Sequence, residues 1–181
     1  MKKVSDIHAI KIIFFITACY VGLWAIRIPT IKDQLQTDYV GVGYIMLSFA
    51  IGSIVAMIFA NALILKTSTK SILTCTLIAE GCLWLPVPFI QELWLFMVFS
   101  FVFGMSYGAF EIACNVYASN LEVREKKSMM SGFHAFWSLG VLFGSLITSF
   151  LLEWNYSFIF NILLYVIILL PLSLYFVLCL E

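Results

Sequence analysis

Residues 93–119 read LWLFMVFSFVFGMSYGAFEIACNVYAS, and this stretch decides the fold class. Its first part, Leu93–Phe110, contains no charged residue. An apolar run of about 20 residues is the length at which an α-helix crosses a hydrocarbon core of roughly 30 Å. Because every backbone polar group in lipid must be satisfied within its own segment, the run predicts a membrane-spanning helix.

Similar apolar runs fill most of the remaining chain. Of the 181 residues, 63% are hydrophobic and 11% are charged, whereas a soluble domain carries about 25% charged residues. We therefore expect an all-α membrane protein with one domain, residues 1–181, of six transmembrane helices. The expected helices lie at about 9–31, 40–65, 71–90, 93–118, 128–152 and 156–179.

Lysine and arginine are distributed unevenly between the two ends of these helices. One side holds Lys2, Lys3, Lys11, Lys66, Lys70, Arg124, Lys126 and Lys127. The other side holds Arg27 and Lys32. Since cytoplasmic loops carry an excess of lysine and arginine, we expect a multi-pass protein of the plasma (inner) membrane with both termini in the cytoplasm.

The sequence carries no signature of an enzyme, a metal site or a nucleotide site. It lacks GxxxxGK[ST], HExxH and a GxSxG with a histidine partner, and its five cysteines lie in apolar runs without CxxC spacing. The formal net charge is zero, so bulk charge indicates no nucleic-acid partner. We expect no catalytic residue, cofactor or metal.

One face of the helix at 93–118 collects its glycines and polar residues. They are Gly104, Gly108, Glu111, Asn115 and Ser119, spaced 4, 3, 4 and 4. The glycine pair forms a GxxxG motif that lets another helix approach closely. A carboxylate in hydrocarbon costs at least a few kcal/mol, so Glu111 is either protonated and bonded to a neighbouring helix or binds a proton or substrate. Asn115, both donor and acceptor, favours the second interpretation.

Three further residues are candidates for the site, each with a structural alternative. Arg27 either snorkels to the interface or pairs with an acid or substrate inside the bundle. Trp24 is either an interfacial belt residue or a stacking platform for a sugar ring. His134 is either a packing residue or part of a proton relay or gate. The helix of His134 also carries a second GxxxG pair, Gly140 and Gly144, which we assign to helix packing.

Glu80 interrupts the apolar run at 71–90. Little that is polar stands at helical spacing beside it, apart from Thr76. It could pair with a neighbouring helix, mark an oligomer contact or reflect relaxed selection, and the pattern assigns it no role.

Three strings together resemble the major facilitator superfamily. They are WAIRIPTIKDQL from Trp24, FEIACNVYAS from Phe110 and HAFWSLG from His134, and they look most similar to the fucose-permease-like and YbjJ-type transporters. The resemblance implies the first six-helix half of a twelve-helix fold, built of two inverted three-helix repeats. It matches Glu111 to a family acid implicated in proton coupling and Asn115 to a family asparagine one turn later.

The resemblance implies a proton-coupled secondary active transporter half, a symporter for a sugar-like or other small polar solute. Its expected partners are the lipid bilayer, the solute, the proton and a second six-helix unit, either a homodimer mate or a separate C-terminal half. One alternative is a truncated N-terminal fragment that transports nothing alone, and a less favoured one is a structural membrane protein. Residues 61–70, NALILKTSTK, depart from the family pattern Gly-x-x-x-Asp-Arg-x-Gly-Arg.

The charge distribution predicts the outcome of reporter fusions. A reporter fused after Glu181 should stay in the cytoplasm, and one inserted between Glu153 and Asn155 should be exported, because lysine and arginine concentrate on the side of the N-terminus. Activity of a paired cytoplasmic and periplasmic reporter at each position measures this. Export of the reporter at the C-terminus would contradict the six-helix count.

Overall fold

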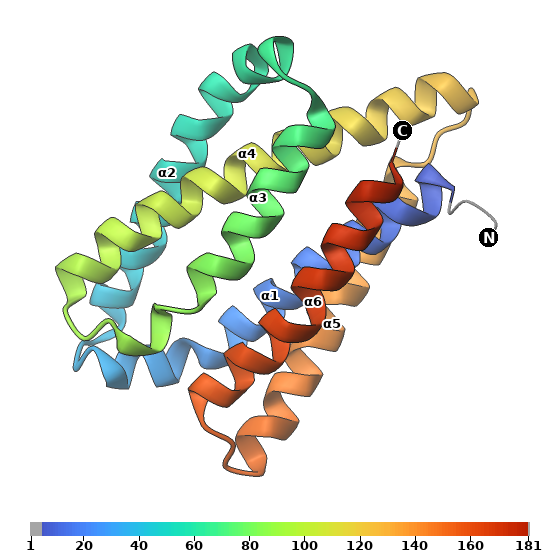
Figure 1. Cartoon of the computed structure of the whole chain (residues 1–181). Coiled ribbons are helices and arrows are strands. Elements are labelled where there is room, and N and C mark those ends of the chain that lie inside the picture. The colour runs from blue at the N-terminus through green and yellow to red at the C-terminus, as the bar shows by residue number, and fades with distance from the viewer. Residues whose placement is uncertain (1–4, 181) are drawn as a thin grey trace.

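Six long α-helices make up the described part of the molecule (Figure 1). The computed structural model describes residues 5–180, apart from the side chains of 60–63 and 65. The helices are α1 (Asp6–Gln34), α2 (Tyr39–Lys66), α3 (Thr69–Trp84), α4 (Leu93–Glu125), α5 (Met130–Glu153) and α6 (Phe158–Cys179), with a 3-10 turn, η1 (Val87–Phe89), after α3. Six spans in the described part of the chain are long and apolar enough to cross a membrane, so the predicted fold class is confirmed.

The third helix is shorter than the expected span of 71–90. It ends at Trp84, and residues Val87–Phe89 form the 3-10 turn. Pro86 and Pro88 explain the early end, because proline lacks a backbone N–H and cannot donate the hydrogen bonds that would continue the helix. The connection to α4 therefore begins inside the apolar run.

The fourth helix is longer than expected, because it continues past residue 118 to Glu125. Contacts with other helices hold this polar extension. The carboxylate of Glu122 accepts hydrogen bonds from two backbone N–H groups at the start of α5, at 2.5 and 2.7 Å, and Arg124 pairs with the buried Asp6 of α1 at 2.8 Å. Hydropathy predicts where a helix leaves the membrane, whereas α4 continues beyond that point as long as its backbone hydrogen bonds do. The other helix ends lie within three residues of the expected positions.

Close packing joins α1 to α5 through small residues on both helices. A Cβ atom on Gly22 would lie 2.5 Å from the carbonyl oxygen of Val141 and the backbone nitrogen of Ser145. On the opposite side of the contact, a Cβ on Gly144 would lie 2.7 Å from the Cα of Cys19. Gly140 meets α1 in the same way one turn earlier. The backbones therefore touch where any side chain would separate them.

The second close pair is α2 with α4. A Cβ on Gly104 would lie 2.8 Å from the carbonyl carbon of Phe49, and one on Gly108 would lie 2.9 Å from the Cα of Ser53. A hydrogen bond adds to this contact, because Ser48 Oγ donates to the carbonyl of Met97 at 2.7 Å. Both GxxxG pairs predicted from the sequence thus lie at a helix–helix contact.

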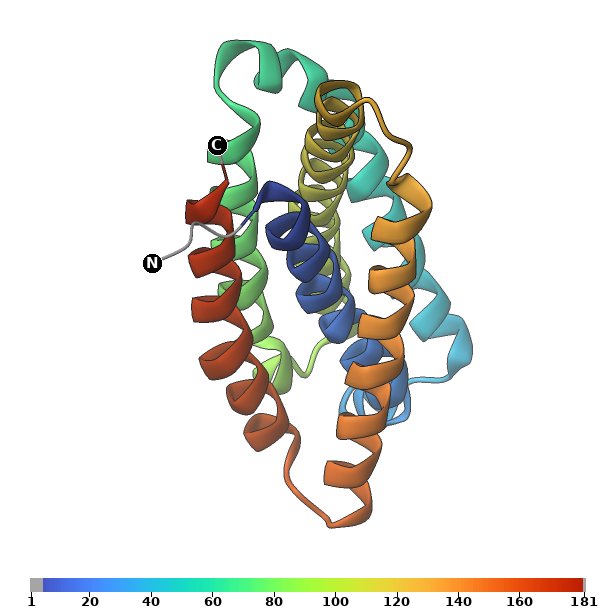
Figure 2. The ribbon, with the colours of Figure 1, turned by 90° about the vertical axis from the view of Figure 1, so that its right-hand side faces the viewer.

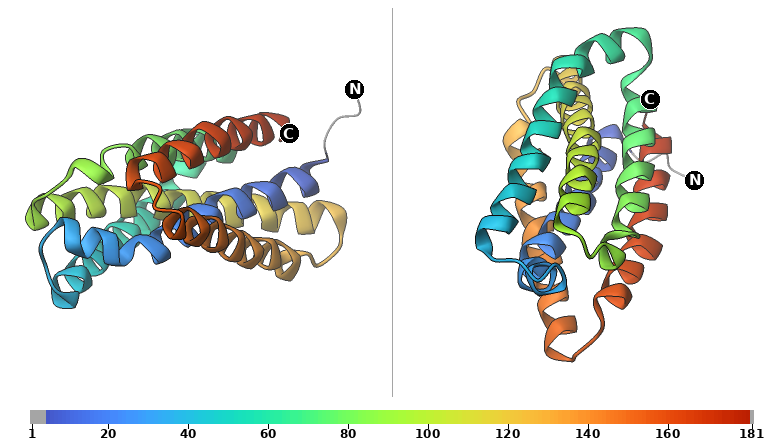
Figure 3. Two further views of the ribbon diagram at one scale, coloured as in Figure 1. Left: turned by 90° about the horizontal axis from the view of Figure 1, so that it is seen from below. Right: turned by 90° about the vertical axis from the view of Figure 1, so that its left-hand side faces the viewer.

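The pairings relate the two halves of the chain. In each three-helix half, the first helix packs on the second helix of the other half, and α3 packs against α6. Figure 2 shows the resulting layers: α3 and α6 lie on one side, α1 and α4 in the middle, and α2 and α5 on the other side. The views in Figure 3 show both termini at the same end of the bundle. This is the arrangement expected of two inverted three-helix repeats.

A substitution at the α1–α5 contact tests this packing. Gly22→Ala should lower the free energy of unfolding by roughly 1–3 kcal/mol, because the new methyl group overlaps the backbone of α5. The matched control is Gly43→Ala on α2, since a Cβ there meets nothing within 4 Å and alanine favours a helix over glycine by about 1 kcal/mol. Thermal unfolding followed by circular dichroism in detergent measures both. Equal melting temperatures for Gly22→Ala and the parent chain would contradict the close contact.

Candidate functional site

Two cavities lie between the α1–α5 pair and the α2–α4 pair, and the region that holds them is named here the crevice. The smaller, of about 160 Å³, is named here the Glu111 pocket. The larger, of about 360 Å³, is named the aromatic cavity. Tyr107 of α4 lines both of them. The crevice therefore holds two neighbouring chambers with a shared wall.

The Glu111 pocket brings together three of the residues singled out from the sequence. Its lining consists of Phe14, Tyr107, Phe110, Glu111, Cys114, Asn115, His134 and Trp137. Glu111 and Asn115 come from α4, His134 comes from α5, and Phe14 supplies the wall from α1. Glu111 and Asn115 are half-buried, and His134 is exposed.

Hydrogen bonds and ring contacts orient the polar groups of the pocket. The amide nitrogen of Asn115 donates to the backbone carbonyl of Glu111 at 2.9 Å, which leaves its amide oxygen and its second N–H available to a ligand. The His134 ring lies edge-on to the Phe14 ring, with centroids 5.6 Å apart. Trp137 of α5 and Tyr107 of α4 both line the pocket.

This combination of groups has a definite chemistry. A carboxylate, an amide oxygen and an imidazole can bind a proton or hydrogen-bond a polar solute. An acid that stays charged in the hydrocarbon region needs a partner or water, so a membrane carboxylate beside a cavity is a candidate for a functional site. The pocket lies open at His134, the most exposed of its polar side chains.

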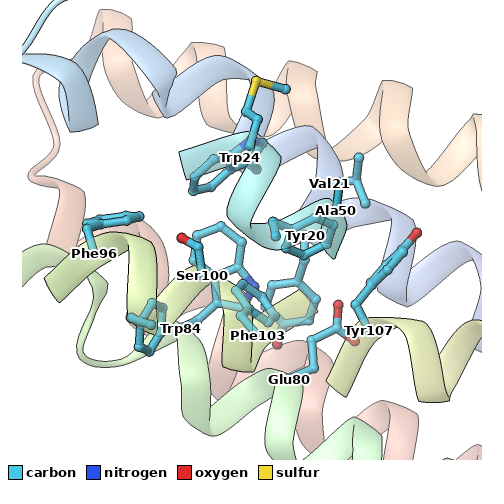
Figure 4. Close-up of a pocket in the computed structure, with 13 residues that line it drawn as sticks. Tyr20, Val21, Trp24, Ala50, Glu80, Trp84, Phe96, Ser100, Phe103 and Tyr107 are labelled. Carbon is cyan, nitrogen blue, oxygen red and sulfur yellow. The ribbon is translucent and has the colours of Figure 1, made fainter. Parts of the chain in front are cut away.

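The aromatic cavity lies beside the same shared wall and contains Trp24. Figure 4 shows its lining: Tyr20, Val21, Trp24, Met46, Phe49, Ala50, Glu80, Trp84, Phe96, Phe99, Ser100, Phe103 and Tyr107. The Trp24 ring packs against the rings of Trp84 and Phe96, with centroids 6.3 Å away in each case. Trp24 thus lines a chamber and is not part of an outward-facing belt.

Sequence reasoning gave no role to Glu80, and the structure places it in this cavity. The side chain is only 6% exposed, and its carboxylate points toward Tyr107 and Tyr20 in Figure 4. One signal was present in the sequence: Trp84 follows Glu80 by one helical turn, so the two side chains share a face of α3. The residues opposite Glu80 come from other helices and cannot be read from local spacing.

Arg27 is not joined to either chamber. Its Nε donates to the side-chain oxygen of Asn161 on α6 at 3.0 Å, and its Nη2 donates to the carbonyl of Tyr156 at 3.3 Å. The guanidinium also lies over the Phe158 ring, 5.4 Å from its centroid. At 2% exposure the side chain neither snorkels nor faces Glu111. The structure gives Arg27 a structural contact that ties α1 to α6.

Comparison with known proteins gives a consistent family match. The sequence profile of the Major Facilitator Superfamily matches residues 12–179. An uncharacterized MFS-type transporter of Yersinia pestis is 28% identical over 145 residues, which cover 78% of this chain and 37% of that protein. An uncharacterized transporter of Sinorhizobium fredii (strain NBRC 101917 / NGR234) is 25% identical over 141 residues, covering 73% and 35%.

The chain thus spans about a third of the length of these curated relatives. No solved structure matches it.

A double-mutant cycle tests the structural role of Arg27. Arg27→Leu removes the donor that binds the buried side-chain oxygen of Asn161, and Asn161→Leu removes that acceptor from the buried guanidinium of Arg27. Each variant should therefore lower the free energy of unfolding by about 2–4 kcal/mol. The double variant should be more stable than the sum of the two losses by roughly 1–3 kcal/mol, because it leaves neither group alone. Thermal unfolding in detergent measures all four proteins. Strict additivity would show that the two side chains do not interact.

Proposed function

Since this chain belongs to the Major Facilitator Superfamily, we propose that it is a six-helix unit of a proton-coupled transporter for a small solute. One observation carries the proposal: Glu111, Asn115 and His134 line a single pocket in the crevice between the two helix pairs. In this proposal Glu111 is the proton-binding carboxylate. Asn115 and His134 are the neighbouring groups that hydrogen-bond solute or proton.

The physics of a carboxylate in the membrane supports this role for Glu111. An uncompensated charge there costs at least a few kcal/mol, so protonation changes the stability of any conformation that buries or exposes the site. A ligand shifts a conformational equilibrium only by its differential affinity for the two states. Binding of a proton to Glu111 can therefore bias the unit between a state that exposes the pocket and one that closes it.

We propose that a second six-helix unit covers the face of the crevice. The curated relatives are longer than this chain, and His134, which lines the Glu111 pocket, is exposed on the surface of this six-helix unit. The second unit is a further part of a longer chain, a second copy or a separate chain. In the alternative, these 181 residues alone transport nothing, and the pocket is one side of an incomplete site.

The proposed location is the inner membrane, with both termini in the cytoplasm. Lys66, Lys70, Arg124, Lys126 and Lys127 lie in or directly beside the α2–α3 and α4–α5 connections, at the end of the bundle that holds both termini. Lys2 and Lys3 lie outside the described residues. Arg27, which the sequence counted on the opposite side, is buried inside the bundle and adds no loop charge there.

The solute remains a prediction. The resemblance to fucose-permease-like transporters favours a sugar, and Trp24 was a candidate platform on which a sugar ring could stack. A sugar-like solute suits the polar Glu111 pocket better than the aromatic cavity, because a sugar among aromatic rings would leave most of its hydroxyls without partners. We therefore propose that a small polar solute binds beside Glu111 and Asn115.

Neutralising Glu111 tests the proton coupling. In proteoliposomes that enclose a pH-sensitive dye, addition of a transported sugar or other small polar solute should cause proton entry, and Glu111→Gln should reduce that entry at least tenfold, because the amide cannot take up the proton. The matched control is Glu153→Gln, an exposed acid at the end of α5. Proton entry in Glu111→Gln at the rate of the parent chain would remove Glu111 from the mechanism.

A further inference from the structure

Glu80 is a buried acid for which the described part of the chain supplies no partner of opposite charge. No lysine, arginine or histidine lines its cavity. Arg27, a buried cation of α1, is bound to Asn161 of α6 instead. A carboxylate in an apolar chamber needs a proton or an incoming cation to offset the loss of hydration. The cavity therefore lacks a positive group that a ligand could supply.

The other walls of the cavity favour a positive charge. Tyr20, Trp24, Trp84, Phe96, Phe99, Phe103 and Tyr107 contribute aromatic rings to the lining. The face of an aromatic ring attracts a cation through its quadrupole, most strongly for tryptophan and where water is excluded. Such walls give an anion nothing comparable. The carboxylate of Glu80 and the aromatic rings together favour a ligand that carries a positive charge.

A second polar atom of the cavity also lacks a partner. The indole nitrogen of Trp84 is buried without a hydrogen-bond partner in the structure, and a buried N–H left unpaired is costly. Trp84 follows Glu80 by one helical turn, so both side chains lie on the same face of α3. A ligand with a hydrogen-bond acceptor near its positive group would satisfy both side chains.

The size of the chamber narrows the class of ligand further. A volume of about 360 Å³ falls within the range of small-molecule sites, roughly 300–1,000 Å³. No cluster of three metal-ligating side chains occurs among the described residues, so the cavity offers a metal ion too few ligands. The chamber suits an organic ion with an apolar body.

We propose that the aromatic cavity is a binding site for a monovalent organic cation with an aromatic or apolar body, whose ammonium group pairs with Glu80. The rings of Trp24, Trp84 and Phe103 enclose the body of the ligand, and the indole N–H of Trp84 donates to an acceptor on it. This site is separate from the Glu111 pocket. Every side chain that the proposal uses belongs to this chain, so binding can be measured on the purified chain without a proton gradient.

Three probes that share one ring test the proposal. Benzylamine is positive, benzyl alcohol neutral and benzoate negative at neutral pH, and calorimetry on the purified chain in lipid nanodiscs measures their affinities. Benzylamine should bind at least about tenfold more tightly than benzyl alcohol, and benzoate more weakly than either. Equal affinities for the amine and the alcohol, or no measurable binding of the amine, would overturn the proposal without any variant.

A matched pair of variants locates the binding. Glu80→Gln keeps the size of the side chain and should reduce benzylamine affinity to that of benzyl alcohol, while Glu153→Gln, exposed at the end of α5, should bind benzylamine as the parent chain does. Helicity and elution volume verify that each variant is folded. Benzylamine binding to folded Glu80→Gln at the affinity of the parent chain would overturn the proposal. Both assays measure binding at Glu80 and not proton-coupled transport at Glu111, so their result is independent of the proposed function.

Discussion

Contact between helix backbones at glycine is the constraint on which the rest of this structure depends. In lipid, helices gain little from burying apolar surface against one another, so close packing at small residues has to hold them together. Gly22, Gly140 and Gly144 join α1 to α5, while Gly104 and Gly108 join α4 to α2. The result is two tight pairs rather than six evenly packed helices, and the crevice runs between the pairs.

The two pairs account for the position of both chambers. α4 contributes Glu111 and Tyr107 from the face that adjoins the α1–α5 pair, and α3 closes the crevice behind with Glu80. Tyr107 lines both chambers, and Trp137 of α5 lines the Glu111 pocket with it. A movement of one pair against the other would therefore change both sites together.

The sequence predicted the features that depend on one helix at a time. Six apolar runs predicted six helices, and the spacing of Glu111 and Asn115 placed these two side chains together in one pocket. Gly104 and Gly108, predicted on the same face, pack against α2 instead. Local sequence patterns could not predict the features that depend on how each helix is rotated relative to its neighbours. Arg27 turned out to face Asn161, a residue 134 positions later, and Glu80 faces rings from α1 and α4. Hydropathy also misplaced the ends of α3 and α4, which prolines and tertiary hydrogen bonds determine.

Water access to the Glu111 pocket tests the account most directly. In a chain whose five native cysteines are replaced, Asn115→Cys and Ile167→Cys can be compared for reaction with a charged, water-soluble thiol reagent in membranes. Asn115 is half-buried in the pocket, whereas Ile167 on α6 is 69% exposed on the apolar surface. The account predicts rapid reaction at position 115 and none at 167, because only the crevice admits water. An inert Asn115→Cys beside a reactive Ile167→Cys would contradict it.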